Sequence, residues 1–513
     1  MKKINSLALL AFAFSTLSAH AEVRLPHVIS DHAVLQRGVP IHLWGWAAPD
    51  AHLTAHFHNQ TVPASANSLG IWSLWLAPET AGGPYTLTIA GDGADTSVND
   101  LLVGDVWFAS GQSNMEFPLN GFTGAPLKNG PQEIAAATNP KIRLLHIANK
   151  ASDIPLTDIT GTWTTCTPDT AAHFSAVAYF FGREIAAKED VPIGLIDSSW
   201  GGTPADSWVS MDTLGTNAEL LPALASRARF ANGQTNLDMQ VAKEHREDDA
   251  AKAAGKPLPA HTWHPFSGAW TPAGIYNGMV SPLAPYSIKG FLWYQGESNS
   301  AHDRAPFYRT LLPALIADWR MHFAQGNLPF LFVQISSFNS PGEDWGTIRD
   351  AQRRTLSVAN TAMAVTLDVG ESSNVHPPDK QTVGDRLALA ARAMVYNEPV
   401  AYNSPLFRQA TAELQPDNTT ALRVWFDYAD KLNTHGKPVA GFELAGDDRH
   451  YLPANARVEG STVLVSSPSV PNPLYVRYAW TSYFDTNLFN AAGLPASTFT
   501  SDDSPLQYVT LIP

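Results

Sequence analysis

The chain has 513 residues, of which 44% are hydrophobic and 16% are charged, a composition typical of globular proteins. Its formal charge of −14 argues against a protein that binds nucleic acid through a phosphate-contacting surface. Because Cys166 is the only cysteine, an intramolecular disulfide is excluded. An isolated thiol in WTTCTPDT is more often structural than nucleophilic.

Residues 1–21 have the pattern of a secretory signal peptide. A basic start (KK) and a short apolar segment over 7–17 precede AHA, a small-x-small cleavage motif. The apolar segment is too short to span a membrane, and no other stretch of the sequence is long and apolar enough to do so. We therefore expect an exported protein, periplasmic or secreted, that begins near Glu22 and has no membrane span.

Two regions have an all-β pattern of short β-branched and aromatic runs separated by Gly, Pro, Asp and Asn. The pattern of residues 22–100 predicts a small β-sandwich-like module, with the runs VPIHLWGW, HLTAHFH, GIWSLWLA and PYTLTIAG. A second β-rich module is predicted over 401–513, with the runs ALRVWFDYA, GFELAG, STVLVSS and LYVRYAW.

Between these modules, over 101–400, strand-like runs alternate with helical patterns. The apolar runs are LVGDVWFA, VPIGLID, IKGFLWYQ, LPFLFVQI and AMAVTLDV. The helical patterns, with apolar residues three and four apart, are FSAVAYFFGREIAAKE, PFYRTLLPALIADWRMHF, IRDAQRRTLSVA and KQTVGDRLALAARAMVYN. Such alternation predicts an α/β domain built on a parallel sheet. Residues of about 205–275, which include the charged helical piece MQVAKEHREDDAAKAA, break the alternation and are predicted to be an insertion.

Polar residues follow the predicted strands, at the edge where open parallel sheets bind ligands. They include the turn SGQSNME after the first run, SSWGG after the second, QGESN after the third and DVGESSNVHP after the fifth. Any one of these segments is compatible with a plain turn. Four of them at the same sheet edge indicate a site.

Acyl transfer is the chemistry that this set of residues fits. Ser113 is the candidate nucleophile, and His376 is the candidate base because the ordinary pKa of a histidine side chain lies near neutrality. Backbone N–H groups of Ser113 and Gly202 are candidate oxyanion donors. A side-chain amide of Gln295 or Asn299 is expected to complete this oxyanion hole. The motif differs from the Gly-x-Ser-x-Gly elbow, since Met115 occupies its last position.

The sequence resembles the SGNH-type carbohydrate esterases grouped with the sialate O-acetylesterases. The matching stretches include LPHVISDHAVLQRGVPIHLWGWAAP, VGDVWFASGQSNMEFPL, GLIDSSWGGTPADSW, YNGMVSPLAPYSIKGFLWYQGESN, VHPPDKQTVGDRLALAARA and VRYAWTSYFDTNLFNAAGLPAS. The resemblance implies an SGNH-hydrolase-like three-layer fold around the parallel sheet. It also implies the roles given above for the nucleophile, the base and the oxyanion donors. The implied reaction releases acetate from a sugar hydroxyl without a metal or organic cofactor.

The sequence departs from this family at the third member of the triad. SGNH enzymes usually carry an acid three residues before the histidine, and that position is Ser373 here. Our hypothesis is that Glu371 or Asp368 orients His376, or that a backbone carbonyl does so and the enzyme uses a dyad. Asp379, which follows the histidine, is better suited to cap a helix.

Candidate substrate contacts are Gln112, Trp200, Trp208 and Glu297, of which the tryptophans could stack on sugar rings. Glu297 is also interpreted as an anchor that fixes its turn, because a second carboxylate in a comparable context, as a glycosidase needs, is missing. His261 and His264 in HTWH lack matching ligands, so no metal site is predicted.

The sequence therefore predicts a serine esterase that removes O-acetyl groups from an acetylated oligo- or polysaccharide. The acidic chain and the lack of arginine in the motifs favour a neutral plant hemicellulose, while sialic acid stays open. Two alternatives also stay open: a glycan-binding protein with a decayed esterase site, and an esterase for non-sugar acyl esters.

Overall fold

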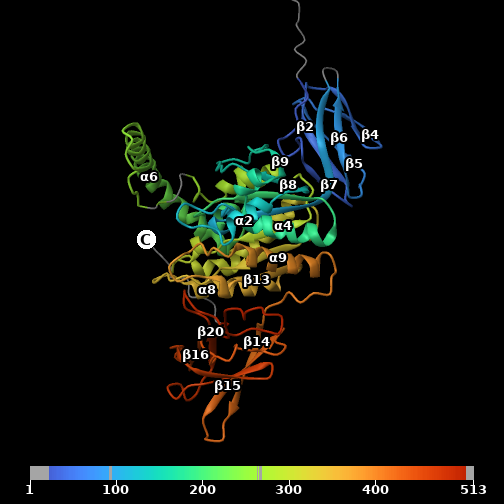
Figure 1. The fold of residues 1–513 in the computed structure, drawn as a ribbon. Helices are drawn as coiled ribbons and strands as arrows, with labels where there is room; N and C mark the ends of the chain where they lie inside the picture. The colour runs from blue at the N-terminus through green and yellow to red at the C-terminus, as the bar shows by residue number, and fades with distance from the viewer. Residues whose placement is uncertain (1–21, 92–94, 263, 265–267, 504–513) are drawn as a thin grey trace, which may run out of the picture.

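The computed structural model describes residues 22–91, 95–262, 264 and 268–503 (Figure 1). The predicted signal peptide lies outside these residues. Figure 1 shows a β-rich part at the N-terminal end, a central body of strands and helices, and a second β-rich part at the C-terminal end.

The central body is built on a parallel sheet, as predicted. Its strand order is β13-β12-β11-β7-β10-β8-β9, with β9 antiparallel to β8 and the other pairs parallel. The strands are β7 (Thr96–Gly111), β8 (Asn139–His146), β9 (Trp163–Cys166), β10 (Ile193–Ser199), β11 (Gly290–Tyr294), β12 (Phe330–Gln334) and β13 (Thr361–Val365). Every residue of β10, β11 and β12 is buried, which explains why the apolar runs are continuous and do not alternate.

Helices cover both faces of this sheet, as two neighbouring residues of β7 demonstrate. Side chains of successive strand residues point to opposite faces. The Trp107 ring packs on Phe181 of α4 (Ala176–Glu189), with ring centroids 4.9 Å apart. The Phe108 ring packs on Trp319 of α7 (Tyr308–Phe323), with centroids 5.4 Å apart. Helix α9 (Lys380–Met394) packs against α4, and α8 (Trp345–Arg354) packs against α7.

Strand β7 belongs to two sheets. Its N-terminal half pairs with β1 and β6, and its C-terminal half pairs with β10 and β11. The boundary predicted at residues 100 and 101 therefore falls inside a continuous strand. The N-terminal strands are β1 (Val34–Gln36), β2 (Ile41–Trp46), β3 (His52–Phe57), β4 (Gln60–Ser65), β5 (Ile71–Leu76) and β6 (Gly82–Ala90).

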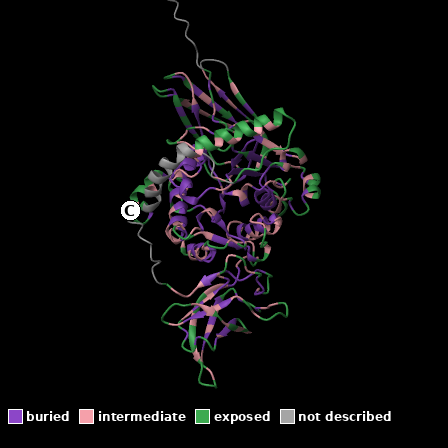
Figure 2. Cartoon of the chain, turned by 90° about the vertical axis from the view of Figure 1, so that its left-hand side faces the viewer, coloured by how far each residue is buried: buried purple, intermediate pink, exposed green. Residues whose placement is uncertain are grey.

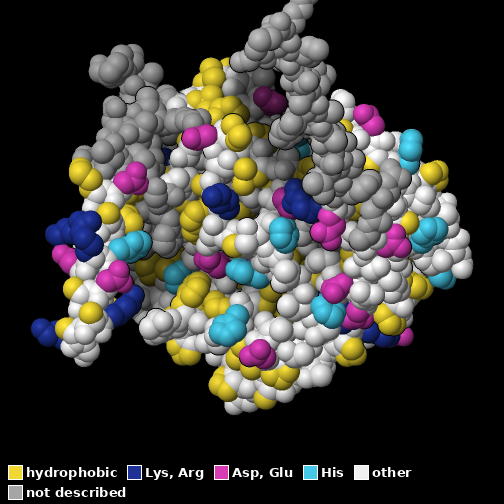
Figure 3. Space-filling model, turned by 90° about the horizontal axis from the view of Figure 1, so that it is seen from above, with side chains coloured by type: hydrophobic (Ala, Val, Ile, Leu, Met, Phe, Trp, Pro, Cys, Tyr) yellow, Lys and Arg dark blue, Asp and Glu magenta, His cyan; other side chains and the backbone are white. Residues whose placement is uncertain are grey.

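The predicted insertion contains a long helix, α6 (Leu221–Ala253), which begins well before the charged stretch that predicted it. Figure 2 shows green, exposed turns in the C-terminal half of this helix, in contrast to the purple central body. Acidic and basic side chains are interspersed on the face that Figure 3 shows.

The remaining short elements are α1 (Ser113–Glu116), α2 (Gly130–Ala136), α3 (Pro168–Ala172), α5 (Met211–Thr216), η1 (Ala205–Trp208), η2 (Ala218–Leu220), η3 (Tyr276–Val280), η4 (Ser281–Leu283), η5 (Glu297–Asn299), η6 (Ala305–Phe307), η7 (Thr355–Ser357) and η8 (Leu367–Val369).

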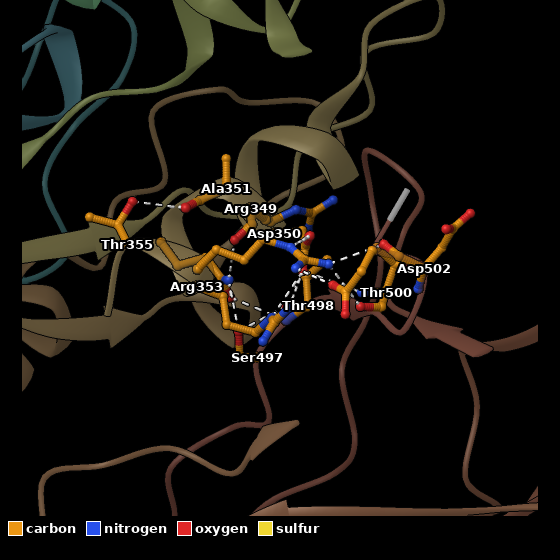
Figure 4. Close-up of polar contacts among 12 residues, drawn as sticks. Arg349, Asp350, Ala351, Arg353, Thr355, Ser497, Thr498, Thr500 and Asp502 are labelled. Atoms are coloured by element: carbon orange, nitrogen blue, oxygen red, sulfur yellow. Dashed lines mark hydrogen bonds and ion pairs between the residues drawn. The ribbon is translucent and has the colours of Figure 1, made fainter. Parts of the chain in front are cut away.

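The C-terminal part contains antiparallel sheets with strand orders β14-β15-β19-β18 and β17-β16-β20-β21. Their strands are β14 (Leu406–Leu414), β15 (Thr420–Asp427), β16 (Phe442–Ala445), β17 (Leu452–Pro453), β18 (Asn455–Glu459), β19 (Thr462–Ser466), β20 (Tyr475–Tyr478) and β21 (Phe499–Thr500). Asp350 of α8 joins this part to the central body (Figure 4). Its carboxylate accepts hydrogen bonds from Arg353, Arg354 and the backbone N–H of Thr500.

Within the described residues, we find no helix that combines the length and the apolar character needed to cross a lipid bilayer.

Replacing Phe108 with alanine is expected to lower the free energy of unfolding by about 3–5 kcal/mol, because a fully buried ring between the sheet and α7 is lost. Trp75, whose side chain is 56% exposed, provides the control, and its replacement with alanine is expected to cost less than about 0.5 kcal/mol. Urea unfolding followed by circular dichroism measures both values. Equal stabilities for the two variants would contradict this account of the core.

Candidate active site

The turn after β7 places Ser113 at the carboxyl edge of the sheet. Gly111 ends the strand with φ +138°, and a Cβ atom there would lie 2.1 Å from the carbonyl oxygen of Tyr294. Glycine is therefore required at this position, because any side chain would collide with β11. Ser113 then begins α1, so its backbone N–H belongs to the unpaired first turn of a helix.

The structure brings Ser113 and His376 together from positions 263 residues apart. The Ser113 Oγ atom lies 2.8 Å from Nε2 of His376, which is hydrogen-bonding distance. The backbone N–H of His376 donates to the Asn374 side-chain oxygen at 2.9 Å, which holds the loop that carries the imidazole. The Phe122 ring meets the imidazole edge-on, with centroids 5.2 Å apart.

The electrostatic surroundings keep His376 neutral. Burial, together with the positive charge of Lys380, lowers the pKa of His376 to about 4. At neutral pH its Nε2 is therefore unprotonated when the other ring nitrogen carries the proton, and it can accept the proton of the Ser113 hydroxyl.

The carboxylates considered as the third triad member have other partners. Asp368 forms a double hydrogen bond with the Arg386 guanidinium, with both distances 2.6 Å. Glu371 accepts a hydrogen bond from the Asn374 side chain at 3.2 Å. Asp379 caps α9, as expected. In the part of the chain that the structure describes, no carboxylate is hydrogen-bonded to the His376 ring.

The Gly201-Gly202 turn lies beside the serine. A Cβ atom added to Gly201 would lie 3.3 Å from Cβ of Ser113 and 2.7 Å from a carboxylate oxygen of Glu116. Among the described residues, none accepts a hydrogen bond from the backbone N–H of Ser113 or of Gly202. Both backbone N–H groups that the sequence predicted as oxyanion donors are therefore able to donate a hydrogen bond to a bound substrate.

The amide donors expected from Gln295 and Asn299 are already used within the protein. The Gln295 amide nitrogen lies within 3.2 Å of three acceptors, namely Asn299 Oδ1, the Thr203 carbonyl and Gln112 Oε1, but has only two hydrogens. The Asn299 amide nitrogen faces Asp206 at 3.4 Å. We therefore correct this expectation: both amides fix the surrounding turns.

One of the four candidate substrate contacts, Trp208, is wrong, and the other three differ in how far they are exposed. Trp208 is fully buried, and its Nε1 donates to Thr203, so it is a core residue. Glu297 is buried against Asn114, which agrees with its interpretation as an anchor. Trp200 is largely buried as well, with 8% of its surface exposed. Gln112 keeps an amide nitrogen that has no hydrogen-bond acceptor among the described residues, while its oxygen accepts from the Ser298 N–H.

A buried polar cluster beneath the serine is the feature that sequence reasoning missed. The Asn114 amide donates to Glu297 at 2.6 Å and to the Val375 carbonyl at 3.0 Å, and its oxygen accepts from Lys380. Burial raises the pKa of Glu297 and lowers that of Lys380 to about 7. Each of these residues lies within a motif that the sequence analysis had singled out. The partners of Asn114 are about 180 to 270 positions away in the sequence, so the motifs alone did not reveal the contacts.

No group of side chains suited to hold a metal ion occurs among the described residues. His261 lies 2.9 Å from Asp248, and His264 lies 2.7 Å from Glu244, so each has a carboxylate partner. Cys166 is buried, and burial raises its pKa to about 11, which leaves the thiol protonated.

Comparisons with known proteins place the chain in a family. Residues 255–393 match the family model described as carbohydrate esterase, sialic acid-specific acetylesterase. The mouse sialate O-acetylesterase is 30% identical to this chain over 94% of the chain and 93% of the mouse protein. This chain belongs to the sialate O-acetylesterase family.

Two further members of this comparison extend over almost the whole chain. The rat sialate O-acetylesterase is 29% identical to this chain, and the alignment covers 98% of each protein. The crystal structure of a carbohydrate acetylesterase from Xanthomonas citri superposes with a TM-score of 0.80 at 34% identity, covering 94% of this chain and all of that one. The similarity to sialate O-acetylesterases therefore extends over the β-rich parts as well as the central body.

The acid side of the pH profile is expected to depend on Lys380. In the wild type, kcat/KM should fall only as the pH approaches about 4, where His376 becomes protonated. Replacing Lys380 with methionine removes a charge that lowers the His376 pKa, so the fall should begin at higher pH. The ratio of kcat/KM at pH 5 to that at pH 7 measures this shift.

Lys128, 60% exposed and paired with Asp379, is the matched control for the Lys380 variant. Its replacement with methionine should leave the profile unchanged, because solvent screens an exposed charge. A Lys380 variant that stays folded and keeps the wild-type acid limb would show that this charge does not act on His376.

Proposed function

We propose that Ser113 and His376 form the catalytic dyad of a carbohydrate O-acetylesterase. The observation that carries the proposal is the 2.8 Å contact between Ser113 Oγ and His376 Nε2, beside two backbone N–H groups that have no acceptor among the described residues. Membership of the sialate O-acetylesterase family supports the same reaction, since its relatives at up to 34% identity are named as acetylesterases.

The chemistry proceeds in two halves. Ser113 Oγ attacks the acetyl carbonyl while His376 Nε2 takes its proton, and the resulting oxyanion accepts hydrogen bonds from the N–H groups of Ser113 and Gly202. Collapse of this intermediate breaks the ester bond, and His376 gives the proton to the departing sugar oxygen, which leaves as a hydroxyl. Water, activated by His376, then attacks the acetyl-serine and releases acetate.

We extend the proposal to the finer architecture: an SGNH-hydrolase-like three-layer domain with an insertion and flanking β-rich modules. We place the catalytic domain at about residues 101–400, between β-rich modules at 22–100 and 401–513, with strand β7 continuing across the first of these boundaries. The basic, apolar and small-residue pattern of residues 1–21 supports export of the protein to the periplasm or the medium.

For the substrate we propose a neutral acetylated glycan, such as a hemicellulose oligosaccharide. The structure brings Arg304 near the Gly201-Gly202 turn, stacked on Trp270 with its guanidinium carbon 4.6 Å from the ring centroid. Asp206 lies 3.0 Å from this guanidinium and balances its charge. A paired arginine offers less to a sialate carboxylate than a free one does, which supports the neutral substrate.

Acetate release from acetylated hemicellulose oligosaccharides and from O-acetylated sialic acid tests the proposal. Wild type is expected to release acetate from the hemicellulose substrate, and Ser113→Ala is expected to lose at least about 1,000-fold in kcat. Release from the sialic acid substrate alone would overturn the substrate proposal. Glycan binding without any release would overturn the proposed activity.

Replacing the two carboxylates singly tests the dyad. Asp368→Asn and Glu371→Gln are expected to keep kcat within about threefold of wild type, whereas loss of a true triad acid costs about 10,000-fold. Thermal unfolding controls for the lost Arg386 pair of Asp368. A large fall in kcat for Glu371→Gln at unchanged stability would establish Glu371 as the third member.

A further inference from the structure

We propose that Glu116 and Trp270 are positioning residues that hold the oxyanion turn from its two sides. Neither residue touches the reacting atoms in the mechanism above, and the inference rests on the proposed function of Ser113 and Gly202. These two residues would orient the Gly202 N–H, which has no acceptor among the described residues, toward the substrate.

Glu116 holds the first side of the turn. One of its carboxylate oxygens accepts a hydrogen bond from the Gly201 N–H at 2.7 Å, and the other accepts from the Asn149 side chain at 3.2 Å. Glu116 is the last residue of α1, the same short helix that begins with Ser113. The nucleophile and one anchor of the turn are therefore parts of one helical turn.

Trp270 holds the second side. Its indole Nε1 donates to the carbonyl oxygen of Gly202 at 2.7 Å. The Arg304 guanidinium covers its ring, and that guanidinium is in turn bound by Asp206. The indole is thus supported by a charged pair instead of depending on the hydrogen bond alone.

Glu116 and Trp270 bind adjacent residues of the turn, Gly201 and Gly202, and their hydrogen bonds determine which backbone N–H of the turn stays available to the substrate. Gly202 has φ +71°, a backbone conformation that favours glycine, and glycine has no side chain to limit its rotation. With the Gly201 N–H and the Gly202 carbonyl both held, the Gly202 N–H beside Ser113 is the group of this turn that has no acceptor in the described part of the chain. An oxyanion hole is effective because its donors are already oriented before charge develops.

The turn could instead be held by its other contacts, and these are present on both flanks. The Trp200 N–H donates to the Gly111 carbonyl at 3.0 Å, and the Ala205 N–H donates to Asn299 at 2.8 Å. These contacts place the ends of the segment. Among the hydrogen bonds of the described residues, those of Glu116 and Trp270 are the ones that act on the two glycines themselves, so we expect them to control the donor direction.

The test compares Glu116→Ala, Glu116→Gln and Trp270→Phe in the full chain, with acetate release as the assay. Glu116→Ala removes the acceptor and is expected to lower kcat by about 10- to 100-fold, part of the 100- to 1,000-fold cost of losing an oxyanion donor. Glu116→Gln retains an acceptor oxygen and is expected to stay within about fivefold of wild type. Trp270→Phe removes only the N–H and is expected to lower kcat by about 3- to 10-fold.

A purely structural role would not produce the accompanying change in inhibitor binding. A small alkyl boronic acid forms a tetrahedral adduct on a serine, so its affinity reports the oxyanion donors. The boronic acid affinity should fall in Glu116→Ala by the same factor as kcat, while KM stays within about twofold. Glu443→Ala, which removes a glutamate paired with Arg477 in the C-terminal sheets, is the control for loss of a charged pair.

The outcomes separate this inference from the proposed function. Unchanged kcat and boronic acid affinity in Glu116→Ala, with Ser113→Ala inactive, would overturn the role of Glu116 and leave the esterase mechanism standing. Acetate release that survives Ser113→Ala would overturn the mechanism itself. If Glu116→Ala fails to fold, Trp270→Phe and Glu116→Gln decide the matter, since equal activity in Trp270→Phe and wild type contradicts the proposal.

Discussion

The side-chain amide of Asn114 is the constraint on which the rest of the site depends. Its nitrogen and oxygen join Glu297, Lys380 and the Val375 carbonyl, so one residue ties the serine turn to the segment after β11 and to the histidine loop. A side-chain amide can serve all three, because it carries both donors and an acceptor. An aspartate could not donate to Glu297, and a leucine would leave a buried lysine without its partner, at a cost of several kcal/mol.

This cluster also sets the balance between base strength and transition-state binding. A histidine whose pKa is about 4 stays unprotonated over a wide pH range, but it is a weaker base than one near neutrality. With no carboxylate among the described residues bound to its ring, the imidazolium that forms during the reaction lacks the usual stabilisation. In the proposed mechanism, more of the barrier must then be lowered at the oxyanion, which gives weight to the orientation of the Gly202 N–H.

Sequence reasoning succeeded where local pattern determines structure. Continuous apolar runs predicted the buried strands, and polar residues at their ends led to Ser113 and His376, which lie 2.8 Å apart. It failed where a side chain has several possible partners. The motifs predicted that Gln295 and Trp208 contact the substrate or its oxyanion, yet the polar groups of both side chains are hydrogen-bonded within the protein. The contacts of Glu116 and Trp270 with the glycine turn join residues 85 and 68 positions apart, and no spacing rule reveals them.

The two β-rich parts support different halves of the dyad. Strand β7 pairs with β1 and β6 before it reaches Ser113, so the N-terminal sheet steadies the strand that carries the nucleophile. On the other side, Ser337 and Phe338 bond to the segment Ser482–Phe484 of the C-terminal part. The same loop packs tightly on Gly370, where a Cβ atom would lie 2.3 Å from the Ser337 carbonyl, six residues before His376. The N-terminal sheet thus supports the strand before Ser113, and the C-terminal part supports the loop that packs on the segment before His376.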